Sequence, residues 1–139
     1  MKKRIILTLT IALVSMFTIT SCKKYEEGPG LSLRSKTARL AEDWVIEKYI
    51  YNGEDRTEEA KALFGADFSF TIKDGGTYTI NGDFSDEGKW ELIESKEVLQ
   101  LTPKDGEIIK YTILKLKNEE LWLRYTDDGD VEDVHYMPK

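Results

Sequence analysis

Few side chains in this sequence could act as nucleophiles or as general bases. The chain holds one cysteine, Cys22, and one histidine, His135, and no serine lies in a Gly-x-Ser-x-Gly pattern. Covalent catalysis needs a nucleophile with a base beside it. His135 alternates with the apolar residues Val134 and Tyr136, so we expect it on the surface beside Asp133. The sequence therefore predicts no enzyme activity, no catalytic residue and no cofactor.

The acidic run Asp127–Asp133 could supply oxygen ligands to a calcium ion. An EF-hand loop needs an oxygen-bearing side chain at its third position, and here that position is Gly129. We interpret the run as a solvated hairpin turn and predict no metal site. The carboxylate pairs Glu58-Glu59 and Asp86-Glu87 are interpreted as exposed charges.

Cys22 is a candidate for lipid attachment. A basic start, Lys2-Lys3-Arg4, precedes the apolar stretch Ile5–Ile19, which is shorter than the roughly 20 residues that span a bilayer. The run Ile19-Thr20-Ser21-Cys22 resembles the lipobox of bacterial lipoproteins. That resemblance implies that residues 1–21 are a cleaved signal peptide. It also implies that Cys22 receives a diacylglyceryl group on sulfur and an acyl group such as palmitate on its amine, which anchors the chain in a membrane.

Residues 22–31 contain Gly28, Pro29 and Gly30 and are typical of a flexible tether. Lys23, Lys24 and the pair Glu26-Glu27 also resemble the surface-export signal of Bacteroidetes lipoproteins, and a plain linker is the alternative. We expect a location in the cell envelope, at the outer membrane, on either its periplasmic or its surface face.

The charge of the chain argues against nucleic acid as a partner. Without Lys2, Lys3 and Arg4, 17 of the 20 basic residues remain against 26 acidic ones, a net charge of −9. A surface of this charge repels phosphate backbones.

Residues 32–139 show the pattern of one all-β domain. Apolar residues recur with period two, as in Phe68, Phe70 and Ile72, which is typical of half-buried strands. Out-of-phase residues near Ile113 predict a β-bulge there. Turn dipeptides separate most of the strands: Asn52-Gly53, Asp74-Gly75, Asn81-Gly82, Asp105-Gly106 and Asp128-Gly129. The pattern predicts an antiparallel up-and-down barrel of eight strands.

Two segments have helical signals. Asp55 is a candidate N-cap, Glu58 occupies the capping-box position and Gly65 is a stop signal, which predicts one short helix between the first two strands. Residues 32–43 could form another short helix before the first strand.

Several aromatic side chains fall on the inward side of the expected strands. Lys48 shares this side with Trp44 and Ile46, which puts it inside the barrel or near a rim, where its ammonium could meet an acidic group of a ligand. The alternative is that Lys48 extends out of a filled core into solvent. An eight-stranded barrel holds either a filled core or one small ligand, and both remain open here. The candidate ligand-binding residues are Trp44, Lys48, Phe68, Phe70, Tyr78, Trp90 and Tyr111. Trp122 has the opposite parity, so either the helix covers it or it forms an exposed contact patch.

Several stretches also resemble the small lipocalin-like lipoproteins of Bacteroidetes. They are the run from Leu31 to Trp44, then Ile46–Tyr49 and Asn52–Asp55, and later Gly88–Leu92 and Leu121–Leu123. The resemblance extends from Leu31 to Met137 and implies an eight-stranded barrel. We expect a non-enzymatic binding module for a small apolar or amphipathic ligand. The alternative is an accessory subunit with a filled barrel that contacts an envelope protein.

Replacing Cys22 with Ala tests the anchor. We expect the Cys22→Ala variant to lose labelling by a fatty-acid analogue and to leave the membrane fraction, because the thiol that forms the thioether is gone. Labelling that persists in the variant would contradict lipid attachment at this residue.

Overall fold

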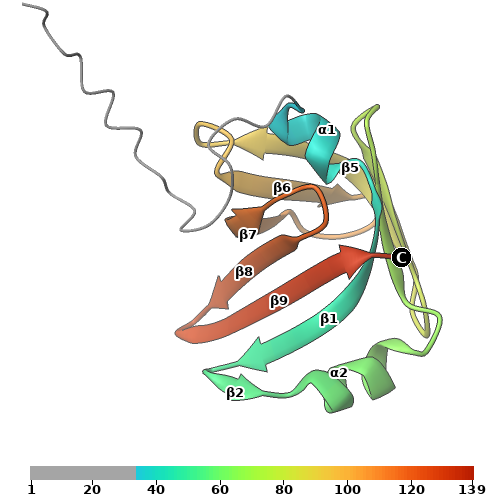
Figure 1. Cartoon of the computed structure of the whole chain (residues 1–139), viewed down its shortest axis with the longest axis vertical. Helices are drawn as coiled ribbons and strands as arrows, with labels where there is room; N and C mark the ends of the chain where they lie inside the picture. The colour runs from blue at the N-terminus through green and yellow to red at the C-terminus, as the bar shows by residue number, and fades with distance from the viewer. Residues whose placement is uncertain (1–33) are drawn as a thin grey trace, which may run out of the picture.

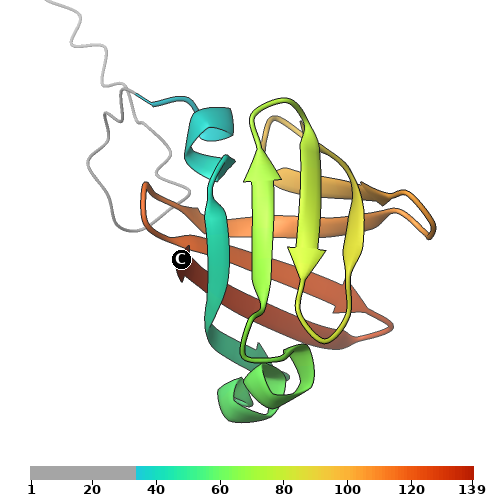
Figure 2. The same cartoon turned by 90° about the vertical axis from the view of Figure 1, so that its right-hand side faces the viewer.

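The fold of residues 34–139 is described by a computed structural model; the predicted signal peptide, Cys22 and tether lie outside these residues. One antiparallel sheet has the order β2-β1-β3-β4-β5-β6-β7-β8-β9, and β1 also pairs with β9 (Figures 1 and 2). The strands are β1 (Asp43–Tyr51), β2 (Glu54–Asp55), β3 (Ser69–Lys73), β4 (Thr77–Asn81), β5 (Asp86–Ile93), β6 (Val98–Pro103), β7 (Ile109–Leu116), β8 (Leu121–Asp127) and β9 (Asp130–Pro138). The helices are α1 (Lys36–Leu40) and α2 (Thr57–Phe64).

Pairing of the first and last long strands closes the barrel. The register runs from Trp44 opposite Pro138 to Tyr51 opposite Glu132, along nearly the whole of β1. This closure confirms the predicted eight-stranded barrel. The short β2 consists of two residues that pair with Ile50 and Tyr51. On the same edge of β1, β3 pairs only with Asp43 and Trp44, so this part of the edge is free. The two residues of β2 are acidic, which discourages pairing with another chain.

Helix α1 covers one end of the barrel. Ser35 caps it by accepting a hydrogen bond from the backbone N–H of Ala38. Leu40 is fully buried, and its carbonyl accepts a hydrogen bond from the indole Nε1 of Trp44 at 2.9 Å. Arg39 donates to the carbonyl of Leu116 at the end of β7. We call this the α1 end.

Helix α2 lies at the opposite end, between the β1–β2 hairpin and β3 (Figure 2). The predicted helix is therefore present, but Asp55 is not its N-cap. Asp55 is still part of β2, where it pairs with Ile50 of β1, so the helix begins only at Thr57. The Asp55 carboxylate accepts hydrogen bonds from the Thr57 N–H and hydroxyl. Gly65 ends the helix, as predicted, with a φ of 93°.

Two β-bulges reset which side chains point inward. The predicted bulge in β7 lies between Ile113 and Lys115. A second bulge, which the sequence pattern did not reveal, lies between Ile46 and Lys48 in β1. The extra residue moves the inward position from Lys48 to Tyr49. The expectation that Lys48 points inward is thus wrong: its side chain lies on the outer face, 3.8 Å from Asp55.

The hairpin turns follow the turn signals only in part. Both residues of Asn52-Gly53 and of Asp128-Gly129 have positive φ, as type I′ turns require. In the β3–β4 turn the positive φ falls on Gly76, and Gly75 does not need it.

These two kinds of glycine give a matched pair of variants. A Cβ at Gly129 or at Gly75 would meet no atom within 4 Å, but only Gly129 has a positive φ, of +92°. We expect Gly129→Ala to lower the free energy of unfolding by about 1 kcal/mol through backbone strain. Gly75→Ala should leave it unchanged or raise it by roughly 0.5 kcal/mol. Urea unfolding of both variants tests this, and an equal effect would contradict the type I′ assignment.

The open end of the barrel as candidate functional site

The barrel interior is filled from the α1 end to its middle. Trp44 is fully buried, and the Phe70 ring contacts the rings of Tyr78 and Tyr136 at centroid distances of 6.0 and 5.8 Å. Trp90 donates from its indole nitrogen to the carbonyl of Lys73. The predicted inward residues Trp44, Phe70, Tyr78 and Trp90 therefore lie together in a packed core.

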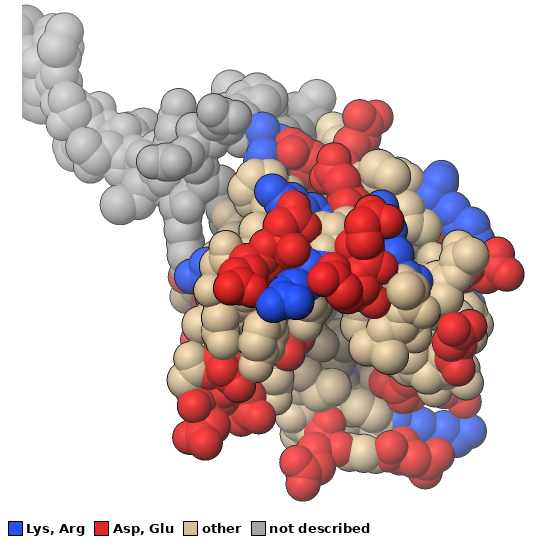
Figure 3. Space-filling model, turned by 90° about the horizontal axis from the view of Figure 1, so that it is seen from below, with Lys and Arg blue, Asp and Glu red and all other residues tan. Residues whose placement is uncertain are grey.

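The α2 end is different, because inward-facing side chains there are only half-buried. They pack against the core and remain in contact with solvent. We call this set the mouth: Tyr49, Ile80, Ile109, Tyr111, Tyr125 and Glu132. Figure 3 looks onto this end and shows a hollow of uncharged side chains with acidic side chains around it.

Aromatic side chains of α2 and its neighbours border the mouth on one side. Phe64 contacts Tyr49 at a centroid distance of 6.4 Å, and Phe68 and Phe84 at 5.5 Å each. The predicted ligand-binding residue Phe68 thus lies beneath the helix, just before β3. Tyr111 is the member of the predicted set that faces the mouth.

The polar groups of the mouth are the hydroxyls of three tyrosines and the carboxylate of Glu132, and the carboxylate of Asp86 lies next to them, opposite Ile80. The rings of Tyr111 and Tyr125 lie 5.8 Å apart. Glu132 lies opposite Tyr125 in the β8–β9 register and near Tyr49 on the neighbouring strand β1. On the other side, the buried Tyr78 donates to the carboxylate of Asp86 at 2.7 Å.

The surroundings keep these tyrosines neutral. Burial, reinforced by Glu132, raises the pKa of Tyr49 to about 12. Burial also raises the pKa of Tyr111 to about 12, with further contributions from Glu132, Tyr125 and Asp86. At neutral pH their hydroxyls are therefore protonated hydrogen-bonding groups beside carboxylates.

The interpretation of Asp86 as an exposed charge is wrong, since Asp86 is half-buried and accepts a hydrogen bond from Tyr78, and sequence reasoning missed Glu132. The parity of both residues carried the signal. Glu132 alternates with Val134 and Tyr136, which are both buried, and Asp86 alternates with Gly88 and Trp90. Neither carboxylate forms an ion pair with a lysine or arginine in the part of the chain that the structure describes. A groove of about 360 Å³ between the β4–β5 hairpin and the loop after β6 reaches Ile80 and Asp86 from outside.

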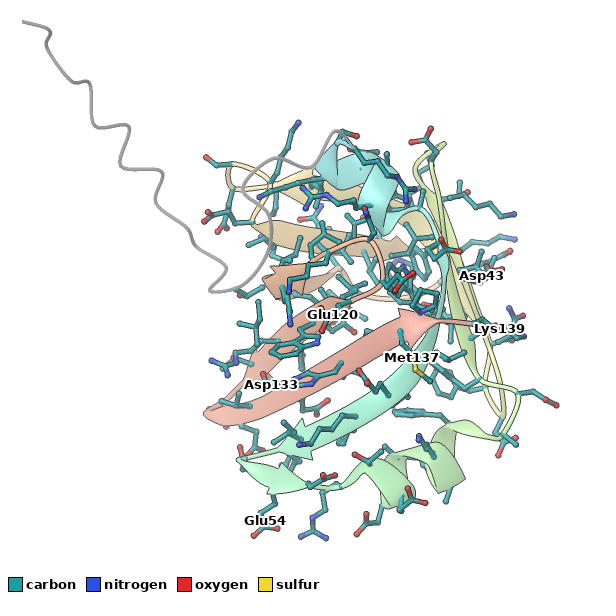
Figure 4. The ribbon with its side chains drawn as sticks, viewed as in Figure 1. Asp43, Glu54, Glu120, Asp133, Met137 and Lys139 are labelled. Atoms are coloured by element: carbon teal, nitrogen blue, oxygen red, sulfur yellow. The ribbon has the colours of Figure 1, made fainter. Side chains whose placement is uncertain are left out.

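A second feature lies on the outer face of β8 and β9. Trp122 stacks on His135 at a centroid distance of 3.9 Å, and the Lys115 ammonium lies 4.1 Å from the Trp122 ring. Lys115 also pairs with Glu120, which Figure 4 labels beside this face. His135 is on the outer face as expected, but it is half-buried against Trp122. Burial lowers its pKa, and the neighbouring Lys48 adds to this effect.

This outer face borders an open groove of about 790 Å³ between the strands and α2. The groove contains Lys48, Trp122 and His135 together with acidic residues of α2. Trp122 thus lies in a surface groove that the helix flanks. Asp133 does not pair with His135, because it binds Arg124 through two hydrogen bonds of 2.7 Å.

Among residues 34–139 no group of three or more His, Cys, Asp or Glu side chains is arranged to hold a metal ion. The same residues contain no helix that is long and apolar enough to cross a membrane.

The raised pKa of Tyr111 predicts how stability changes at alkaline pH. Below pH 10 the folded and unfolded chains both keep the Tyr111 proton, so its contribution is complete. Between pH 10 and about 12 only the folded chain keeps it, and the free energy of unfolding falls as the pH rises. We expect Tyr111→Phe to make this decline shallower in urea unfolding across that range. An equally steep decline in both proteins would contradict the burial of this hydroxyl.

Comparison with known proteins agrees with this geometry. A family model described as a lipocalin-like domain matches residues 40–123, more than half of the chain. The crystal structure of a lipocalin-like protein from Bacteroides uniformis superposes with a TM-score of 0.55 and 10% sequence identity, over 73% of this chain and 99% of that chain. No curated protein matches the sequence. With its closed antiparallel barrel and a family match over more than half of its length, this chain belongs to the lipocalin-like domain family.

Proposed function

We propose that this protein is a non-enzymatic binding module that takes a small apolar or amphipathic molecule at the mouth of its barrel and is anchored in the cell envelope by lipid on Cys22. The observation that supports it is the contrast between the two ends of the barrel. Inward side chains other than Leu92 are buried at the α1 end, whereas Tyr49, Ile109 and Tyr111 are half-buried at the α2 end. A concave site with apolar walls and a few polar groups is the usual composition of a small-molecule site.

The position of the described N-terminus fits an anchored module. Arg34 directly precedes α1, so a tether from Cys22 would reach the barrel at the α1 end. The mouth lies at the other end, beside α2 (Figure 1). In this arrangement the anchor and the entry path of a ligand do not compete for the same end.

The second candidate function is that of an accessory subunit in an envelope complex. The packed core around Trp44 and Phe70 favours it, and so does the outer groove around Trp122. An aromatic ring stacked with a histidine and a lysine on an otherwise charged face is a suitable contact for a protein partner.

Titration with the neutral, environment-sensitive fluorophore N-phenyl-1-naphthylamine separates the two functions. The chain is expressed from residue 22 with Cys22→Ala, so that no lipid competes for the site. We expect saturable binding with a stoichiometry of one. Ile109→Trp should abolish it by filling the mouth, because Ile109 faces inward and is half-buried.

Lys110→Trp is the matched control, since it adds the same ring to an exposed position of the same strand. Absence of saturable binding, or binding that survives Ile109→Trp, would overturn the binding-module proposal and favour the accessory subunit.

A further inference from the structure

We propose that the mouth selects organic cations, namely molecules with an ammonium group on an apolar body. This inference rests on the proposed function, because it names the ligand class of the same site. It also reverses the charge that the sequence suggested. Lys48, the expected partner of an acidic ligand group, lies outside the barrel beside Asp55.

The first observation is that the charges facing the mouth are negative. Asp86 lies opposite Ile80 in the β4–β5 register, and Glu132 lies opposite Tyr125 in the β8–β9 register, so the two carboxylates lie on different sides of the mouth. Within residues 34–139 neither of them has a basic partner within ion-pair distance, whereas Asp133 and Glu120 are paired with arginine or lysine. A half-buried carboxylate without a counter-ion favours a cationic ligand.

The second observation is the set of aromatic rings around these carboxylates. Tyr111 and Tyr125 lie ring to ring at 5.8 Å, and Tyr49 lies near Glu132 on the neighbouring strand β1. Ring faces attract ammonium groups through their quadrupole, and the attraction is greatest where water is partly excluded. Aromatic faces and a carboxylate therefore converge on the same space.

The third observation concerns Tyr136. Its side chain is only 9% exposed, and none of the hydrogen bonds of residues 34–139 involves its hydroxyl. Tyr136 lies on the inward side of β9, which it shares with Glu132, and its ring contacts Phe70. This oxygen can accept a hydrogen bond from an N–H group of a bound ammonium.

The rim of the mouth adds a long-range attraction of the same sign. The loops and turns that surround the mouth carry many carboxylates, and Figure 3 shows acidic side chains with some basic ones among them at this end. Lys104, in the loop after β6, pairs with Glu87. The acidic residues are Asp83, Asp105, Glu107, Asp127, Asp128 and Asp130. Such a field raises the local concentration of cations and lowers that of anions.

Three ligands with one tail and different head groups test the inference: octylammonium, 1-octanol and octanoate. Isothermal titration uses the chain from residue 22 with Cys22→Ala at neutral pH. We expect octylammonium to bind at least roughly tenfold more tightly than octanol, and octanoate to bind most weakly. The double variant Asp86→Asn, Glu132→Gln should reduce octylammonium binding by about tenfold and leave octanol binding unchanged.

The matched control is Asp74→Asn, Glu119→Gln, which removes the same charge from exposed positions near the α1 end. Both double variants reduce the net charge of −9 by the same amount, so an effect of net charge alone would appear in the control as well. We expect the control to leave all three affinities unchanged. Asp86 accepts a hydrogen bond from Tyr78, so replacing it could destabilise the fold. If the double variant melts at a lower temperature, the single variant Glu132→Gln replaces it in the titration.

The outcomes distinguish this inference from the function on which it rests. If octanol and octylammonium bind with equal affinity, or if the control variant weakens octylammonium as much as the mouth variant does, selection of cations is wrong and the binding module stands. If none of the three ligands binds saturably, the proposed function fails and this inference fails with it.

Discussion

Antiparallel pairing between β1 and β9 is the constraint on which the other features depend. A sheet that closes on itself leaves no long edge exposed to other chains. Closure also requires β1 to follow β9 along nearly all of its length, from Trp44 to Tyr51. On its other edge β1 pairs with β3 only at Asp43 and Trp44. Helix α2, with its aromatic residue Phe64, occupies the side where these two strands diverge.

The bulge in β1 connects this closure with the difference between the ends of the barrel. Before the bulge, Trp44 and Ile46 point into a packed core; after it, Tyr49 points into the mouth. Without the extra residue, strict alternation would place Lys48 in the interior and Tyr49 outside. One inserted residue therefore places Tyr49, and not Lys48, at the mouth.

The elements could be predicted from the sequence because they depend on local patterns. Alternation gave the strands, and Asn52-Gly53 and Asp128-Gly129 gave the turns, since both need only neighbouring residues. The β1 bulge could not be found this way, because polar residues Glu47 and Lys48 satisfy either register on an exposed strand segment. The β5–β6 turn has positive φ at Glu94, Ser95 and Lys96, none of which is a glycine, so it carried no turn signal. The mouth could not be predicted either. Its residues are defined by which inward side chains stay in contact with solvent, and this depends on how α2 packs in three dimensions.

The composition of the mouth is unfavourable for a barrel with a purely structural role. Leaving Ile80, Ile109 and Tyr111 half-buried forgoes apolar burial worth roughly 25 cal/mol for each Å² that stays in contact with water. Placing the half-buried Glu132 among them, without an ion pair within residues 34–139, adds a cost of partial desolvation. An apolar residue in place of Glu132 would fill the same space without that cost. A site that binds an organic cation accounts for both costs together, because the ligand covers the half-buried rings and neutralises the carboxylate in one step.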